Sequence, residues 1–260
     1  MTSPTIPKGG FILLMTACIA PDINSVKRSD PTTRLNDYKT SLLYWLNYDE
    51  QRITGIVFIE NSSYDLVELK HVVDKNNKYR RDVEFLSITP TEIPPGLHYG
   101  YSELEMIDHA FDHSALLIKA EYIVKVTGRL YFPRLARLID EVLVKKYDVI
   151  ADSRDFDFFK LKKHYVLTTL FIVQKDFYME VLYNSKRKMS PHLHHMELVY
   201  FNILKPLAKI KNKTVQIRFP FNVEPTGIGA HWGVDYKSKK KRFESYLRAL
   251  FRFILPFFKV

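Results

Sequence analysis

The sequence has almost no cysteine and no long uninterrupted apolar run. Its single cysteine, Cys18, excludes an internal disulfide, and the Cys/His spacing of a zinc ribbon or finger is missing. No run reaches the roughly 18 apolar residues of a membrane-spanning helix. The glycine patterns of dinucleotide-binding turns and P-loops are also missing. The lack of a possible internal disulfide favours a reducing compartment, and we expect the protein in the cytoplasm.

What is present is a core-forming composition. Hydrophobic residues make up 46% of the 260 residues and aromatic residues 14%, which excludes a disordered chain. The length suits either one large domain or one domain plus an appendage. The apolar run Phe11 to Ala20 follows Lys8 and could pass for a short signal peptide. It contains Thr16 and ends in Pro21-Asp22 without a clear cleavage site, so we expect a buried strand instead.

Positive charge is concentrated at the C-terminus. The formal net charge is +10, and residues 237–260 hold eight lysines and arginines against Glu244 alone. A nucleic-acid-binding body would carry its basic residues across a folded face, so no nucleic-acid partner is expected. We therefore predict a catalytic domain over residues 1–236 and a separate basic tail over residues 237–260.

The tail has the pattern of an amphipathic helix. Helical spacing places Phe243, Tyr246, Leu247, Leu250, Phe251 and Ile254 on one stripe, with Lys241, Ser245, Arg248 and Arg252 largely opposite. Such a helix is typical of the interface of an anionic membrane. Alternatively, the aromatic stripe packs on the core and leaves a solvated basic back. The sequence Pro256-Phe257-Phe258 favours the membrane. The expected membrane residues are Lys239, Lys240, Lys241, Arg242, Phe243, Leu247, Arg248, Phe251 and Arg252.

Apolar β-rich runs alternate with helical patterns along the body. The predicted strands are Phe11 to Ala20, Gly55 to Glu60, Val83 to Ile88, Tyr122 to Val126, Tyr147 to Ala151, Val166 to Val173 and Val215 to Phe219. The predicted helices are Arg34 to Trp45, Tyr64 to Val73, Ser102 to Leu117, Pro133 to Val144 and Pro191 to Leu207. Ser102 and Glu105 form a capping box at the start of the third helix. This order predicts an α/β fold with a mostly parallel sheet.

In an open α/β sheet, ligands bind at the carboxyl ends of the strands. Thr127-Gly128-Arg129 follows one predicted strand and supplies a hydroxyl, a glycine that allows close backbone approach, and a guanidinium suited to a diphosphate. A turn with an incidental arginine is the alternative.

Two short motifs resemble a known family. Gly-Tyr-Ser-Glu at 100–103 opens the predicted helix, and Lys-Val-Thr-Gly-Arg at 125–129 closes the strand after it. This pairing resembles bacterial GT-A-type glycosyltransferases of surface polysaccharide synthesis (lipopolysaccharide or capsule), loosely from the first strand to about Asp235. The resemblance implies a GT-A-like fold, a single Rossmann-like mixed sheet flanked by helices and followed by the C-terminal basic amphipathic helix.

The resemblance also implies a donor site at the strand ends. Its expected residues are Thr16, Ala17, Arg34, Glu60, Asn61, Ser62, Lys125, Thr127, Gly128, Arg129 and Arg154. Alternatives remain, because Arg34 could pair with Asp37 and Asn61-Ser62 could start a turn that caps the next helix.

A metal is possible but not favoured. GT-A enzymes usually hold a divalent cation with Asp-x-Asp where this sequence has Thr127-Gly128-Arg129, and an arginine could offset the diphosphate charge instead. The sequence has a literal Asp-x-Asp at Asp155 and Asp157, with His231 as a further candidate ligand.

An inverting transferase needs a carboxylate to accept the proton of the acceptor hydroxyl. The resemblance points to Glu197, near the start of a predicted helix whose N-terminus favours the ionised form. A glutamate that merely complements the helix dipole is the alternative, and Asp152 is the alternative base. Inversion and retention both stay open.

We therefore expect a glycosyltransferase on the inner face of the cytoplasmic membrane. It would move a sugar from a nucleotide-sugar donor, expected to be a UDP-sugar, to a saccharide or lipid-linked acceptor. The alternatives are a noncatalytic protein that binds nucleotides or nucleic acid through the basic tail, and a nucleotide-sugar hydrolase on the same scaffold.

Overall fold

A computed structural model describes residues 9–21, 26–157, 160–210, 214–229, 233 and 235–254, without the side chains of 154–164. Its strands are β1 (Phe11–Ala17), β2 (Ile53–Glu60), β3 (Asp82–Ser87), β4 (Tyr122–Thr127), β5 (Leu130–Tyr131), β6 (Val149–Asp157), β7 (Lys160–Gln174), β8 (Val215–Gln216) and β9 (Thr226–Gly227). Its α-helices are α1 (Pro31–Asn47), α2 (Val67–Asn76), α3 (Gly100–His113), α4 (Ala115–Lys119), α5 (Leu135–Lys145), α6 (Lys175–Phe177), α7 (Met196–Leu207) and α8 (Lys239–Ile254). A π-helical turn (Tyr178–Leu182) and a 3-10 turn (Ser185–Lys188) join α6 to α7.

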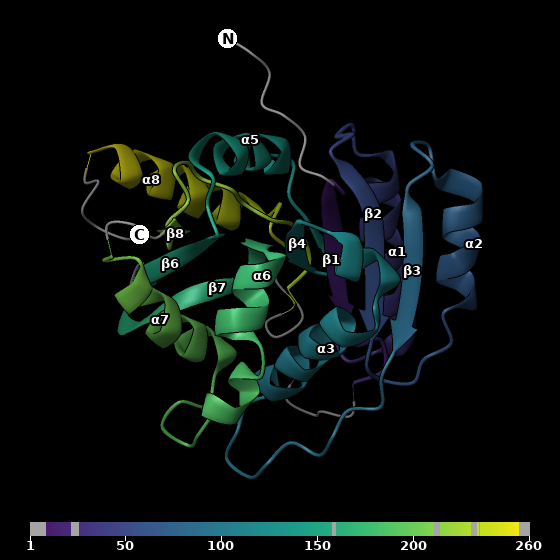
Figure 1. Cartoon of the computed structure of the whole chain (residues 1–260), viewed down its shortest axis with the longest axis horizontal. Helices are drawn as coiled ribbons and strands as arrows, with labels where there is room; N and C mark the ends of the chain where they lie inside the picture. The colour runs from purple at the N-terminus through teal and green to yellow at the C-terminus, as the bar shows by residue number, and fades with distance from the viewer. Residues whose placement is uncertain are drawn as a thin grey trace.

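Within these residues the main sheet has seven strands in the order β3-β2-β1-β4-β7-β6-β8 (Figure 1). Strands β1 to β4 run parallel to one another, whereas β7 is antiparallel to both β4 and β6. Helices flank the sheet. The predicted fold, a mixed α/β sheet with a C-terminal basic amphipathic helix, is confirmed.

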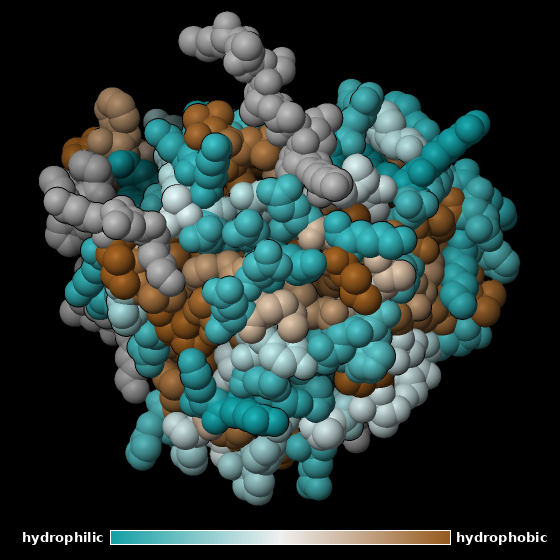
Figure 2. Space-filling model, viewed as in Figure 1, coloured by the Kyte–Doolittle hydropathy of each residue, from teal (hydrophilic) through white to brown (hydrophobic). Residues whose placement is uncertain are grey.

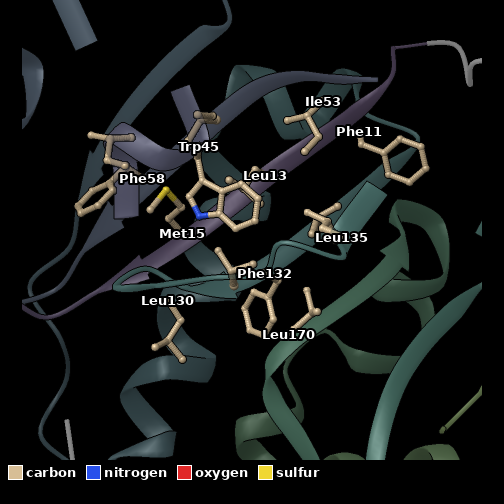
Figure 3. Packing of buried hydrophobic residues seen from close by; sticks show 14 of the residues in the cluster. Phe11, Leu13, Met15, Trp45, Ile53, Phe58, Leu130, Phe132, Leu135 and Leu170 are labelled. Carbon is tan, nitrogen blue, oxygen red and sulfur yellow. The ribbon is translucent and has the colours of Figure 1, made fainter. Parts of the chain in front are cut away.

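Strand β1 is buried along its whole length because both of its faces are covered, and apart from Thr16 its residues are apolar. Phe11, Leu13 and Met15 belong to a cluster with α1, α2 and α5, whereas Ile12 and Leu14 belong to a second cluster with α3, α4 and α7. Figure 3 shows part of the first cluster, in which the indole of Trp45 lies beside the β1 side chains. The side-chain period of two thus assigns alternate residues of β1 to opposite layers.

The expected capping box at Ser102 is wrong. Helix α3 begins at Gly100, its N-cap is Tyr99, and no side chain caps it. The N–H of Ser102 already bonds to the carbonyl of Tyr99 at 3.1 Å. Glu105 instead accepts hydrogen bonds from Thr91 and forms an ion pair with Lys186. A Cβ on Gly100 would lie 3.2 Å from Met196 of α7, so a larger residue here would make a tight contact between the two helices.

Helix α8 forms over most of the predicted tail, and it packs on the body. The guanidinium of Arg252 donates to both carboxylate oxygens of Asp152 in β6, at 2.8 and 2.6 Å. Among the helices of the described residues, none combines the length and the apolar character that crossing a membrane requires.

Candidate functional site

The strand order reverses direction at β1 and β4, whose carboxyl ends lie side by side. Thr16 of β1 is in register with Thr127 of β4, and chain connections leave in opposite directions from this point. Such a switch point opens a crevice outside the sheet. Here it is a cavity of about 400 Å³. The cavity is lined by the expected donor-binding residues Thr16, Ala17, Arg34, Asn61, Ser62, Thr127 and Arg129.

Gly128 allows the two strand ends to approach closely. Its N–H donates to the carbonyl of Thr16 at 2.9 Å. A Cβ on this residue would lie 2.7 Å from that same carbonyl oxygen and 3.2 Å from the ring of Tyr38. A glycine is therefore required at this position by the close approach of the two strand ends. Gly128 itself does not line the cavity.

Glu60 serves the loops that surround the cavity. It is fully buried at the end of β2, and its carboxylate accepts the backbone N–H groups of Ile19, Ser62 and Tyr64 at 2.8 to 3.2 Å. It also accepts a hydrogen bond from the Ser62 hydroxyl, which in turn accepts from Ala20 N–H. Glu60 thus ties the loop after β1 to the loop after β2 and holds Ser62 at the cavity wall.

Two arginines bring positive charge to the cavity. Arg34 is 4% exposed and donates to the carbonyls of Cys18 and Arg28. It does not pair with Asp37, which binds Arg28 instead. Arg129 donates through Nε to the carbonyl of Ile228 at 3.0 Å.

The hydrogen bonds of Arg129 occupy one side of its guanidinium, and the rest of the group lines the cavity. Besides the Nε bond, its Nη1 makes only a long contact of 3.5 Å with the hydroxyl of Tyr38 among the described residues. The side chain is partly exposed and lines the cavity. Its outer edge can therefore donate two hydrogen bonds to an anion such as a phosphate.

Asn61 carries an unsatisfied acceptor. The residue is 7% exposed and lines the cavity, yet among the described residues its Oδ1 atom has no hydrogen-bond partner. A buried amide oxygen without a donor costs about 1–3 kcal/mol, so such an atom normally meets a ligand or an ordered water. An amide that offers acceptor and donors side by side suits the hydrogen-bonding edge of a nucleobase.

A buried ion pair lies at the floor of the cavity. Lys125 of β4 is fully buried and donates to Glu103 at 2.5 Å and to the carbonyl of Thr168 at 2.6 Å. Glu103 also accepts from the hydroxyl of Thr16 at 3.1 Å, and it lines the cavity. Burial disfavours its charged form, but the ammonium of Lys125 and these hydrogen bonds hold the pKa of Glu103 below its usual value.

Lys125 therefore acts on the cavity through Glu103, rather than lining it. Sequence reasoning quoted Glu103 in a motif without assigning it a role. It also missed Tyr38, whose hydroxyl accepts from Cys18 N–H at 2.9 Å. The spacing of Arg34 and Tyr38 by four helical residues was a signal that could have found it.

Glu197 lies at the second position of α7, beside this ion pair. Its Oε1 contacts the Thr168 hydroxyl at 3.4 Å, and its Oε2 is buried without a partner among the described residues. Burial raises the pKa of Glu197, and the negative charge of Glu103 raises it further. The helix start was expected to favour the ionised form, and here burial outweighs that effect. Thr168 links Glu197 to Lys125, so Glu197 belongs to the layer beneath the cavity.

The alternative base, Asp152, lies elsewhere. It is 2% exposed, and besides Arg252 it accepts the N–H of Phe219 at 3.1 Å. It does not line the cavity. The side chains of Arg154, Asp155 and Asp157, and the whole of His231, lie outside the described residues. In the part of the chain that the structure does describe, no group of three His, Cys, Asp or Glu side chains is arranged to hold a metal.

No protein-family model and no curated protein sequence matches the chain. Several solved structures resemble it. A proposed glucose-1-phosphate thymidylyltransferase from Bacillus anthracis is 9% identical with a TM-score of 0.49, over 92% of this chain and 94% of that one. HddC from Yersinia pseudotuberculosis, complexed with GMP-PN, is 15% identical with a TM-score of 0.46, over 94% and 99%.

The mannosyltransferase Ktr4p from S. cerevisiae is 13% identical with a TM-score of 0.42, over 77% of this chain and 64% of that one. The similar structures thus include nucleotidyltransferases and glycosyltransferases. At these identities the similarity concerns the fold alone, and the interpretation of the cavity rests on its own residues.

Proposed function

We propose that the chain is a glycosyltransferase that takes its sugar from a nucleotide-sugar donor, a UDP-sugar being the expected one. The observation that carries this proposal is the cavity at the β1/β4 switch point. It combines the unsatisfied amide oxygen of Asn61, the open guanidinium edge of Arg129 and the ionised carboxylate of Glu103. These groups suit, in turn, a nucleobase, a diphosphate and a sugar hydroxyl.

The nucleoside would lie between the ends of β1 and β2, against Thr16, Ala17, Asn61 and Ser62. The diphosphate would then extend toward Arg129, which offsets its negative charge. Thr127 lines the same wall. Because the guanidinium supplies part of the charge that a divalent cation supplies in other transferases, we expect donor binding without a metal.

The acceptor hydroxyl must lose a proton during transfer. We propose Glu197 as the base because burial raises its pKa whereas that of Glu103 is lowered, and a carboxylate with a raised pKa is the stronger proton acceptor. Glu197 lies beneath the cavity and does not line it, so the proposal requires the bound acceptor to open a path to its carboxylate. The acceptor would be a saccharide or a lipid-linked saccharide, reached at the inner face of the cytoplasmic membrane.

Donor binding is tested by thermal unfolding with a panel of nucleotides and nucleotide sugars, in EDTA and in Mn²⁺. A ligand at about a hundred times its dissociation constant adds about 2.7 kcal/mol to the free energy of unfolding. We expect a nucleotide-specific rise in melting temperature that survives EDTA. Arg129→Ala should lose most of it because the diphosphate loses its cation.

Arg187→Ala is the matched control, since Arg187 is an exposed arginine outside the cavity. It should keep the full shift. A wild-type protein that no nucleotide stabilises would contradict the donor site. A shift that appears only with Mn²⁺ would contradict the metal-free proposal. Product analysis with and without a saccharide acceptor distinguishes a transferase from a nucleotide-sugar hydrolase.

A further inference from the structure

Helix α8 turns its polar face toward the protein. Arg252 binds Asp152 and the carbonyl of Phe219 at 3.0 Å, and the hydroxyl of Ser245 lies 2.8 Å from Nδ2 of Asn222. Arg248 is 4% exposed and lies 3.6 Å from Glu224. Arg248 and Arg252 of the predicted basic back therefore contact the body instead of lipid or water, whereas Lys241 pairs with Glu244 of the same helix.

The opposite face carries large apolar side chains into solvent. Their exposed fractions run from 40% to 86%, and they are Phe243, Tyr246, Leu250, Phe253 and Ile254. Their spacing, i, i+3, i+7, i+10 and i+11, makes one continuous stripe along the helix. Figure 2 shows hydrophobic side chains projecting at the upper left, where Figure 1 places α8. We call this stripe the outward face.

The buried ion pair fixes this orientation. A helix free to roll would bury its apolar stripe and expose its arginines, as the second sequence-based alternative expected. Rotation of α8 about its axis would break the Arg252–Asp152 pair, whose side chains are 8% and 3% exposed. It would leave the buried carboxylate of Asp152 without its cation. The fold thus holds the outward face away from the core, which implies that something else covers it.

We propose that the outward face lies in the interface of an anionic phospholipid membrane. Lys239, Lys240 and Arg242 are exposed on the first turns of α8, at the end of the apolar stripe. Aromatic and aliphatic residues beside a basic cluster are the composition of an interfacial helix. The chain's net charge of +10 favours an anionic surface over a second copy of itself.

This inference reaches beyond sugar transfer and uses none of the cavity residues. The membrane contact then consists of the outward face and the exposed basic residues at the start of α8, without Arg248 and Arg252. If the acceptor is lipid-linked, the same surface would bring the enzyme to it, but the binding itself does not depend on the reaction.

The test is cosedimentation of the full chain with phosphatidylcholine vesicles, with and without phosphatidylglycerol. We expect binding to the anionic vesicles only. Phe253→Glu, at the most exposed position, should reduce binding at least tenfold. Ile118→Glu is the matched control because Ile118 of α4 is also apolar and 56% exposed, and it should bind like the wild type. Replacing Lys239, Lys240 and Arg242 with glutamine should remove the preference for anionic lipid.

Three results would overturn the proposal. One is a wild-type protein that does not bind anionic vesicles. Another is equal loss of binding in Phe253→Glu and Ile118→Glu. The third is a concentration-dependent dimer, seen by sedimentation velocity and dissolved by Phe253→Glu, without vesicle binding, which would assign the outward face to a second copy. Nucleotide binding measured on the same samples reports separately on the cavity, so the two proposals can fail independently.

Discussion

Two buried ion pairs of the described residues each have one partner in the main sheet, and they differ in what their carboxylates face. At the switch point, Lys125 is fully buried while the Glu103 side chain is 20% exposed and lines the cavity. Under α8, Arg252 and Asp152 are 8% and 3% exposed and face only protein. An open pair can present a carboxylate to a ligand, whereas a closed pair can only orient the element that it joins.

Lys125→Met removes the cation of the pair at the switch point, and we expect it to have the largest effect on stability. Removing one partner of a buried pair costs about 3–5 kcal/mol, and among the described residues Glu103 would keep the hydrogen bond from the hydroxyl of Thr16. We expect a loss of about 4 kcal/mol in the free energy of unfolding, measured in urea at neutral pH. The double variant with Glu103→Gln should recover part of it, because no unpaired charge then remains.

The pH dependence of the same pair has a definite sign. The pKa of Glu103 is lowered in the folded protein, so the pair contributes stability above the usual glutamate pKa and loses it as the pH falls through the lowered one. In Lys125→Met this contribution should reverse, and acidification below neutrality should stabilise the variant. A variant within about 1 kcal/mol of the wild type at every pH would show that the pair is not important for folding.

The second test, Arg252→Met, addresses the closed pair. Asp152 would keep the N–H of Phe219, so we expect a smaller loss of about 3 kcal/mol. Because the pair orients α8, hydrogen exchange should rise across residues 239–254 and leave the strands of the switch point protected. Arg242→Met changes an exposed arginine of the same helix and should shift stability by less than about 0.5 kcal/mol. Equal effects of the two variants would refute an orienting role.

The third test, Glu197→Gln, should change stability least and activity most. Burial raises the pKa of this carboxyl, so its contribution to stability is present below the usual glutamate pKa and is lost as the pH rises through the raised one. The glutamine variant should therefore gain stability relative to the wild type as the pH increases. Sugar transfer should fall roughly 10²–10⁴-fold, with donor affinity unchanged. Full activity in Glu197→Gln would assign the base to another group.

The sequence anticipated the sheet and the position of the cavity. Hydrophobic runs separated by helical patterns specify parallel strands, and the carboxyl ends of such strands meet at one edge. For this reason Thr16, Asn61 and Arg129 could be assigned to one site from the sequence alone. Strand ends were less certain, since the predicted run from Phe11 to Ala20 leaves the sheet at Ala17.

The partners of buried charges were not anticipated. Glu103 and Lys125 are 22 residues apart and lie on a helix and a strand whose relative rotation depends on packing. Asp152 and Arg252 are 100 residues apart. Helical spacing separated the two faces of α8 correctly, but amphipathicity alone does not tell which face meets the body. Which face of α8 meets the body depends on the carboxylate of Asp152, which is far from α8 in the sequence.

The only cysteine of the chain lies in the cavity wall. Burial raises the pKa of the Cys18 thiol, so its thiolate is scarce at neutral pH and alkylation should be slow. A small fluorophore attached there under mildly alkaline conditions would sit at a single position in the site, without any engineered substitution. Cys18 is thus a built-in labelling position from which an attached fluorophore would report on ligands that enter the cavity.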